Sequence, residues 1–119
     1  MNKVEKLAMD FVRNKLRRNH IKFKEFKPRD KKGCDFITYK NSRIKNYIEV
    51  KGRSDTYGFI NLNQYNIQSK NINDLPSNWI LWVVTYHKLK RVNNIIFSRK
   101  DTINRSKESK IWEISMRKK

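Results

Sequence analysis

The chain has 119 residues, and 29 lysines and arginines against 11 acids give it a formal net charge of +18. Its 37% hydrophobic content, with three glycines and two prolines, excludes a disordered composition and predicts a single domain over residues 1–119. So high a charge favours a polyanionic partner, with nucleic acid first. A membrane surface, a ribosome, or charge kept only for solubility are the alternatives.

The single cysteine, Cys34, excludes an internal disulfide and a structural zinc site. No apolar run of about 18 residues is present, so no membrane-spanning helix and no membrane partner are expected. The N-terminal stretch lacks the apolar core of a signal peptide. We therefore expect an intracellular protein, either cytoplasmic or nucleoid-associated.

The first predicted element is an amphipathic helix. Its apolar residues recur at spacings of three and four and form one stripe: Val4, Leu7, Ala8, Phe11, Val12 and Leu16. Basic residues lie largely off this stripe, and the arginines of the last turn suit the negative end of the helix dipole.

Three strands are predicted next. Residues 21–26 alternate apolar and charged side chains, as a half-buried strand does. Residues 34–40 and 43–52 are expected to form a hairpin that turns near Asn41 and Ser42.

The second half of the chain is expected to complete an α/β sandwich. Residues 59–71 begin extended and turn helical near Leu62. Residues 79–86 are almost wholly apolar, as a strand covered on both faces is. Residues 92–98 and 110–116 follow as two short strands separated by a polar stretch. This order indicates a mixed central sheet flanked by helices.

Residues 43–52 contain a glutamate and a lysine in an apolar setting. Alternation along a strand assigns their side chains to two faces, one with Tyr47, Glu49 and Lys51 and the other with Ile44, Ile48 and Val50. The two charged groups therefore share a face. They form either a solvated surface pair or part of a site.

The hairpin register decides what faces Glu49. If Phe36 pairs with Ile48 on the core side, Asp35 lies directly across from Glu49. Paired residue numbers then sum to about 84, which implies a loop with an odd number of residues. Two facing carboxylates repel each other unless a divalent cation lies between them.

Mg²⁺ suits this arrangement because it prefers hard oxygen ligands and keeps several waters. Asp35, Glu49 and the main-chain carbonyl of Val50 are the predicted ligands, with positions left for a phosphate oxygen and a water. The metal would lower the pKa of that water and offset charge in the transition state. Lys51 would orient the nucleophile.

The stretch "GCDF", followed by "EVK" at a spacing of fourteen from Asp35 to Glu49, resembles the PD-(D/E)XK nuclease superfamily. The resemblance implies a restriction-endonuclease-like α-β-β-β-α-β core, Mg²⁺ with Mn²⁺ as a substitute, and Lys51 as the motif lysine. It also implies positions near the metal for Glu5 and Gln64, which are otherwise a first-turn acid and an ordinary helix residue. Cys34 replaces the usual proline.

A narrower resemblance spans roughly residues 4–97. The blocks "VEKLAMDFV", "GCDF", "RIKNYIEVKGRS", "FINLNQ" and "NWILWVVTY" are similar to the NO VEIN-type domain, which often accompanies helicases and restriction-like systems. Gln64 stands where that domain usually has glutamate. Archaeal Holliday-junction resolvases are more distantly similar in size, basic character and the Asp…Glu-X-Lys pattern.

Basic segments flank the predicted site on both sides. The residues expected to contact nucleic acid are Arg13, Arg17, Arg29, Lys31, Lys32, Arg53 and Gln64. Contacts from them would go to the backbone and depend little on base sequence.

The sequence thus predicts a metal-dependent endonuclease that hydrolyses DNA phosphodiester bonds with Asp35, Glu49, Lys51 and Glu5. Selectivity for branched or junction DNA would call for two sites, and in that case we expect a homodimer. The alternatives are a non-catalytic nucleic-acid-binding module with the same fold and a basic RNA- or ribosome-associated protein.

Overall fold

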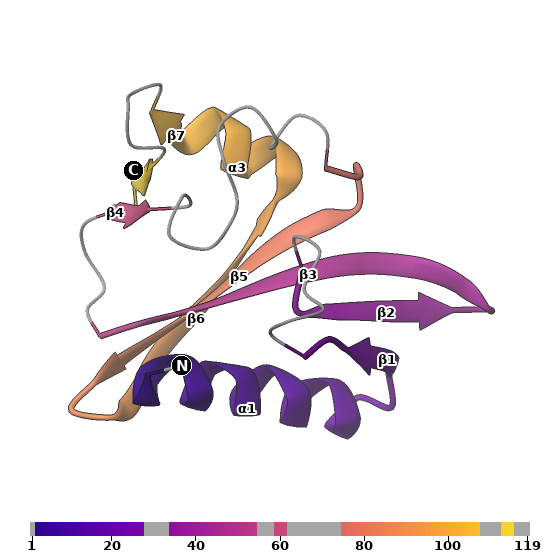
Figure 1. The fold of residues 1–119 in the computed structure, drawn as a ribbon, viewed down its shortest axis with the longest axis horizontal. Coiled ribbons are helices and arrows are strands. Elements are labelled where there is room, and N and C mark those ends of the chain that lie inside the picture. The colour runs from indigo at the N-terminus through magenta and orange to yellow at the C-terminus, as the bar shows by residue number, and fades with distance from the viewer. Residues whose placement is uncertain (1, 28–33, 55–58, 62–74, 108–112, 116–119) are drawn as a thin grey trace.

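The structure, a computed structural model, describes residues 2–27, 34–54, 59–61, 75–107 and 113–115. A five-stranded sheet lies between two helices, one on each face (Figure 1). The elements are α1 (Lys3–Arg18), β1 (Lys22–Glu25), β2 (Phe36–Lys40), β3 (Arg43–Arg53), β4 (Phe59–Asn61), β5 (Trp79–His87), β6 (Lys90–Ser98), α3 (Arg99–Arg105), β7 (Ser106–Lys107) and β8 (Glu113–Ser115).

The strand order in the main sheet is β1-β2-β3-β5-β6. Only β3 and β5 are parallel, and the other neighbours are antiparallel. The short strands β4, β8 and β7 form a second sheet. The predicted first helix, the three strands after it and the mixed sheet are confirmed. The helix expected from Leu62 lies outside the described residues.

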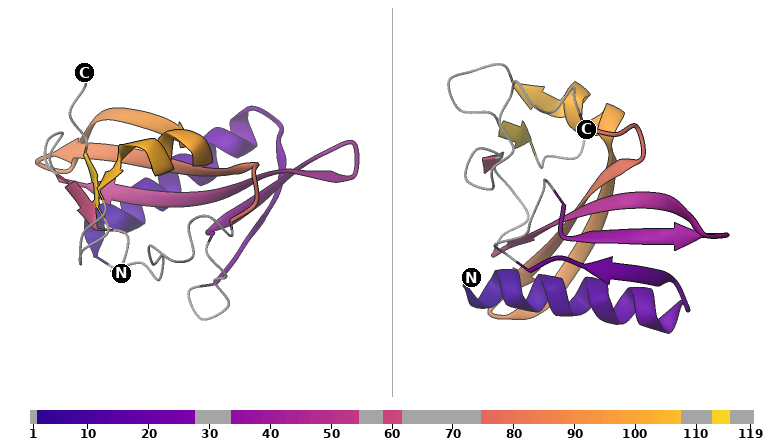
Figure 2. Two further views of the ribbon diagram at one scale, coloured as in Figure 1. Left: turned by 90° about the horizontal axis from the view of Figure 1, so that it is seen from above. Right: turned by 45° about the vertical axis from the view of Figure 1, so that its right-hand side comes forward.

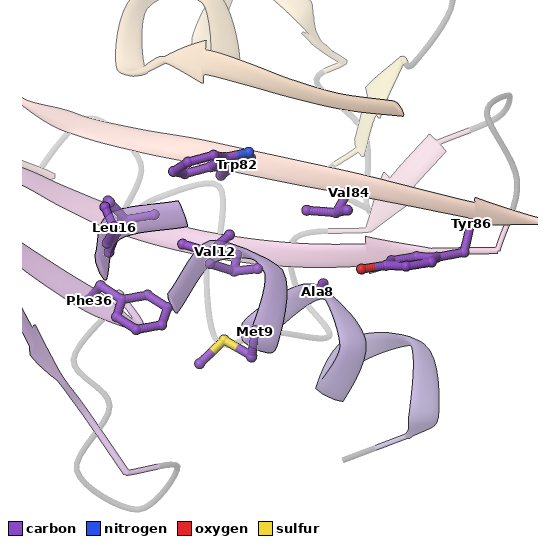
Figure 3. Packing of buried hydrophobic residues seen from close by; sticks show 10 residues of the cluster. Ala8, Met9, Val12, Leu16, Phe36, Trp82, Val84 and Tyr86 are labelled. Atoms are coloured by element: carbon purple, nitrogen blue, oxygen red, sulfur yellow. The ribbon is translucent and has the colours of Figure 1, made fainter. Parts of the chain in front are cut away.

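Helix α1 covers one face of the sheet. Asn2 caps it, because its Oδ1 accepts a hydrogen bond from the Glu5 amide at 2.8 Å. Ala8, Val12 and Leu16 of the predicted stripe are buried against β2, β3 and β5 (Figure 3), and Val4, Leu7 and Phe11 are partly buried. This core cluster comprises Ala8, Met9, Val12, Leu16, Phe36, Ile48, Val50, Trp82, Val84 and Tyr86.

Gly52 brings the start of α1 into direct contact with the end of β3. A Cβ at this position would lie 2.6 Å from the carbonyl oxygen of Val4 and 3.1 Å from the Cβ of Ala8. Backbone atoms cannot yield as the end of a flexible side chain can, so only glycine permits this approach. The glycine that follows "EVK" thus fixes where α1 begins over the strand.

The other face of the sheet holds a second core cluster. Trp79, Leu81, Val83 and Phe97 are buried there, and Ile103 of α3 packs against them. Because β5 contributes side chains to both clusters, it is covered on both faces as predicted.

The β2–β3 hairpin has the predicted register but not the predicted loop. Phe36 pairs with Ile48, and the register shifts after Thr38. The turn has two residues, Asn41 and Ser42, with φ of 53° and 63°. Positive φ at both central positions matches the twist of a tight hairpin. A one-residue bulge, and not an odd-numbered loop, produces the register at the site.

The bulge also moves Ile44. It pairs with Tyr39, so it does not share the buried face of Ile48, and it is 42% exposed. The predicted grouping of Ile44 with Ile48 and Val50 is therefore wrong.

Helix α3 begins in the polar stretch that was expected only to separate two strands. Ser98 precedes it and its Oγ accepts a hydrogen bond from the Asp101 amide at 3.0 Å. Thr102 is fully buried, and its Oγ donates to the Ser98 carbonyl at 2.8 Å.

Within the described residues, no helix is long and apolar enough to cross a membrane.

Candidate metal and nucleic-acid site

Glu49 and Lys51 form a buried ion pair on the α3 side of the sheet. The Lys51 Nζ lies 2.7 Å from Glu49 Oε1, and the two residues are 1% and 0% exposed. In the parallel ladder they lie beside Leu81 and Val83 of the apolar strand β5. The alternative of a solvated surface pair is therefore wrong. Their shared face, which strand alternation predicted, is confirmed.

Asp35 directly precedes β2 and is hydrogen-bonded to the backbone of the residues on either side of Glu49. Its Oδ2 accepts a hydrogen bond from the Val50 amide at 2.7 Å, and its own amide donates to the Ile48 carbonyl. The residue is 7% exposed. Continuing the Phe36–Ile48 register by one residue brings Asp35 opposite Glu49. This is the register that the predicted juxtaposition of the two acids requires.

The three buried groups do not balance in charge. Two carboxylates and one ammonium carry a net charge of −1 when all are ionised, and a buried charge requires compensation. The Val50 amide and Lys51 are among the groups that supply it. The donor set of carboxylate oxygens suits a hard cation such as Mg²⁺.

A metal here would have few protein ligands. Among the residues that the structure describes, no three His, Cys, Asp or Glu side chains gather closely enough to hold an ion. Asp35 and Glu49 would therefore need the predicted Val50 carbonyl, waters or a phosphate to complete the shell. This is the ligation that Mg²⁺ tolerates, since it usually keeps several waters. The Val50 side chain itself packs on the α1 side.

The structure gives Glu5 a local role. Its amide donates to Asn2 Oδ1, and its Oε1 accepts from Asn2 Nδ2 at 3.4 Å, so the two residues are joined at the start of the helix. Through Gly52 and Val4, the start of α1 lies near the end of β3. Glu5 nevertheless belongs to no cluster of three potential metal ligands in the described part of the chain.

Arg13 is held by two intramolecular carboxylates. Its guanidinium donates to both oxygens of Glu25 at 2.7 and 2.8 Å and to Asp10 at 2.6 Å. The hydrogen bonds to Glu25 are the main cause of the raised pKa of Arg13; partial burial opposes them, and the hydrogen bond to Asp10 adds to them. This residue joins α1 to β1, so it is less suited to phosphate contact than predicted.

The other predicted nucleic-acid residues have different settings. Arg17 is exposed and its guanidinium lies 6.0 Å from the centre of the Phe23 ring. Arg53 is half-buried at the end of β3. Arg29, Lys31, Lys32 and Gln64 lie outside the described residues.

The family comparison covers the whole candidate site. A family model described as "Protein NO VEIN, C-terminal" matches residues 4–97, well over half of the chain. The chain belongs to this family. The NO VEIN C-terminal match runs from α1 to the end of β6, so it includes Asp35, Glu49 and Lys51. It confirms the NO VEIN-type resemblance over the span that the five sequence blocks predicted. No curated protein is similar enough to this chain to count as a match.

Gly52 is a positioning residue that the sequence analysis did not identify. The signal was present, because glycine directly follows the "EVK" stretch inside an otherwise regular strand. In this NO VEIN C-terminal domain it allows α1 to cross β3 beside Lys51.

Proposed function

We propose that this chain is a metal-dependent endonuclease of the PD-(D/E)XK type that hydrolyses DNA phosphodiester bonds. The observation that carries the proposal is the buried trio of Asp35, directly before β2, and Glu49 and Lys51 on the paired strand β3. The order of α1, β1, β2 and β3, followed by β5 parallel to β3, supports a restriction-endonuclease-like arrangement.

The chain's own groups have distinct tasks in this proposal. Asp35 and Glu49 would hold the cation, and the Val50 amide orients the Asp35 carboxylate for it. When bound, the metal supplies an activated water and charge stabilisation of the phosphoryl transition state. The Lys51 ammonium group, which is held by Glu49, would add positive charge where the phosphate would lie. Branched DNA as the substrate would call for a homodimer with two such sites.

A second candidate function rests on the burial of the same trio. Side chains that are 0%, 1% and 7% exposed offer a phosphate little access in this conformation. A binding module that keeps the nuclease-like fold without cleavage would have the same three residues as a structural charge cluster. The two functions differ in one measurable respect, which is metal-dependent bond breakage.

The test is cleavage of labelled single-stranded, duplex, flapped and four-way-junction DNA and one RNA, with and without Mg²⁺ or Mn²⁺. We expect metal-dependent products on DNA that vanish in Lys51→Met and Asp35→Asn. Lys6→Gln, an exposed change on α1, serves as the control and should cleave normally. Binding without cutting on every substrate would establish the second function. Cleavage that survives in both site variants would refute the assignment of the site.

A further inference from the structure

Two basic hairpin tips lie at opposite ends of the main sheet. The β2–β3 tip (residues 40–45) and the β5–β6 tip (residues 87–91) project on opposite sides in every view (Figures 1 and 2). Since β3 and β5 are parallel, the first tip precedes β3 and the second follows β5. The longest dimension of the molecule is 38 Å, and the two tips mark its ends in Figure 1.

The two tips share one chemical character. Each carries exposed cations, namely Lys40, Arg43 and Lys45 in the first and Lys88, Lys90 and Arg91 in the second. Neither hairpin contains an acid between residues 36 and 48 or between residues 79 and 98. Each tip also exposes a large apolar side chain, Ile44 at 42% and Leu89 at 47%.

The two residues of the β5–β6 turn adopt a left-handed backbone conformation that their residue types disfavour. Lys88 and Leu89 have φ of 50° and 65°, a region that glycine and asparagine occupy far more readily. Because Leu89 is exposed, burial of its side chain does not offset the cost of this backbone conformation. A two-residue hairpin turn requires these φ values, so the unusual feature is the choice of an exposed leucine at this position and not the backbone geometry.

Both tips are fixed at their bases. Arg91 stacks on Phe11 at 4.3 Å from the ring centre, and Phe11 meets Trp82 edge-on. At the other end, Asn46 Nδ2 donates to the Asn78 carbonyl, and Asn78 Nδ2 donates to the Lys45 carbonyl. Each tip therefore presents its cations from a braced strand pair.

The candidate site lies between the tips. Glu49 lies five positions after Ile44, or about 17 Å along an extended strand. Leu89 lies six positions after Val83, which pairs with Lys51, or about 20 Å. At 3.4 Å per base pair, the 38 Å length corresponds to about 11 base pairs, close to one turn of B-DNA.

We propose that the two tips contact one DNA duplex about one helical turn apart, with the candidate site between them. Their lysines and Arg43 neutralise phosphates, and Ile44 and Leu89 contact the walls of the groove. The inference rests on the proposed nucleic-acid substrate but not on cleavage.

Fluorescence anisotropy without divalent metal tests this, on duplexes of 8, 12, 16 and 20 base pairs across a range of salt. Three variants lose equal charge: Lys40→Gln with Lys45→Gln, Lys88→Gln with Lys90→Gln, and, as control, the exposed pair Lys6→Gln with Lys100→Gln. Each tip variant should bind the 16-base-pair duplex about tenfold more weakly and reduce the salt slope by about 2. The control should stay close to the unmodified protein.

Duplex length tests the geometry. An 8-base-pair duplex spans about 27 Å and cannot reach both tips, so affinity should rise steeply between 8 and 16 base pairs. That rise should disappear in either tip variant. A rise that persists in both, a control as weak as the tip variants, or equal affinity for single-stranded DNA of 16 nucleotides would overturn the inference.

Leu89→Gly separates contact from folding. It relieves the left-handed strain, so the midpoint of thermal unfolding should hold or increase, whereas duplex affinity should fall at least threefold. Unchanged affinity would overturn the role of Leu89. Because no metal is present, failure of binding at the tips remains distinct from failure of cleavage at the site.

Discussion

The Nζ of Lys51 lies 2.7 Å from Oε1 of Glu49, two residues earlier on the same strand, and both side chains are sealed from solvent. Residues i and i+2 of a strand lie on the same face, and two charged side chains there are normally exposed to solvent. Here the neighbouring strand β5 is apolar. The pair is therefore retained at the expense of desolvation, which is the physical reason to expect a function there.

Breaking the pair from one side should be severe. Lys51→Met leaves the Glu49 carboxylate buried beside β5, and we expect a loss of about 3–5 kcal/mol in the free energy of unfolding without metal. Adding Glu49→Gln removes the stranded charge, so the double variant should recover most of that loss. Urea unfolding of the two single variants and the double variant measures the coupling. Strictly additive losses would show that the two side chains do not interact.

Divalent cations should stabilise the fold through the same residues. Mg²⁺ at about 100 times its dissociation constant would add about 2.7 kcal/mol to the free energy of unfolding. Asp35→Asn keeps an oxygen for the Val50 amide but loses a negative ligand, so it should abolish most of this gain. Thermal unfolding with and without Mg²⁺ is the measurement, with the exposed Asp101→Asn as control. An equal gain in the wild type and in Asp35→Asn would rule out a metal at this acid.

Gly52→Ala should destabilise the protein although it adds only one methyl group. The added carbon would lie 2.6 Å from the Val4 carbonyl oxygen, so either α1 or β3 must shift. We expect a loss of about 1–3 kcal/mol, the usual range for overpacking. Urea unfolding measures it, and Ser54→Ala, an exposed change two residues later, should be close to neutral. A neutral Gly52→Ala would contradict the close approach.

Arg13→Lys should have a small effect. It loses the paired hydrogen bonds to Glu25, but these groups are only partly buried, at 24% and 33% exposure. Solvent screening therefore limits the expected loss to about 1 kcal/mol or less. Comparison with Arg18→Lys, an exposed change near the end of α1, isolates the Glu25 contact. DNA binding should change little, because Arg13 is already engaged with carboxylates.

Periodicity was enough to predict the framework of the sheet. The spacing of Val12 and Leu16 identified the buried face of α1, and the apolar run of β5 indicated cover on both faces. The pairing of Phe36 with Ile48 followed from matching the apolar faces of two strands. Each of these depends on a repeat that many residues share, so single exceptions do not obscure it.

What the sequence left undetermined depends on single residues. A three-residue loop and a two-residue turn with a bulge give the same register at Glu49, and nothing in "KNSR" separates them. Ile103 is the one apolar residue of helix α3 and packs against the core, so the periodicity of the helix is too weak to detect. The burial of Lys51 depends on what covers its face, which strand alternation alone does not specify.

Tyr86 should make the protein less stable in alkali. It is 4% exposed in the α1 core (Figure 3), and burial raises the pKa of its phenol above the ordinary value of 10.0, while Arg91 opposes the shift. The folded state therefore keeps this proton longer than the unfolded chain does. Its contribution to stability is complete below pH 10 and is lost as pH rises through the folded pKa. Deprotonation of the lysines also changes the stability of the fold in this pH range, so the effect of Tyr86 must be measured by comparing variants.

Thermal unfolding from pH 9 to pH 11 tests this contribution. Tyr86→Phe removes the titrating group and keeps the ring, so its unfolding temperature should fall less over that range than that of the wild type. Tyr39→Phe, a half-buried control on β2, should follow the wild type. If Tyr86→Phe falls as steeply as the wild type, the phenol is not held neutral by burial. The packing of α1 over β5 would then leave the hydroxyl accessible to water.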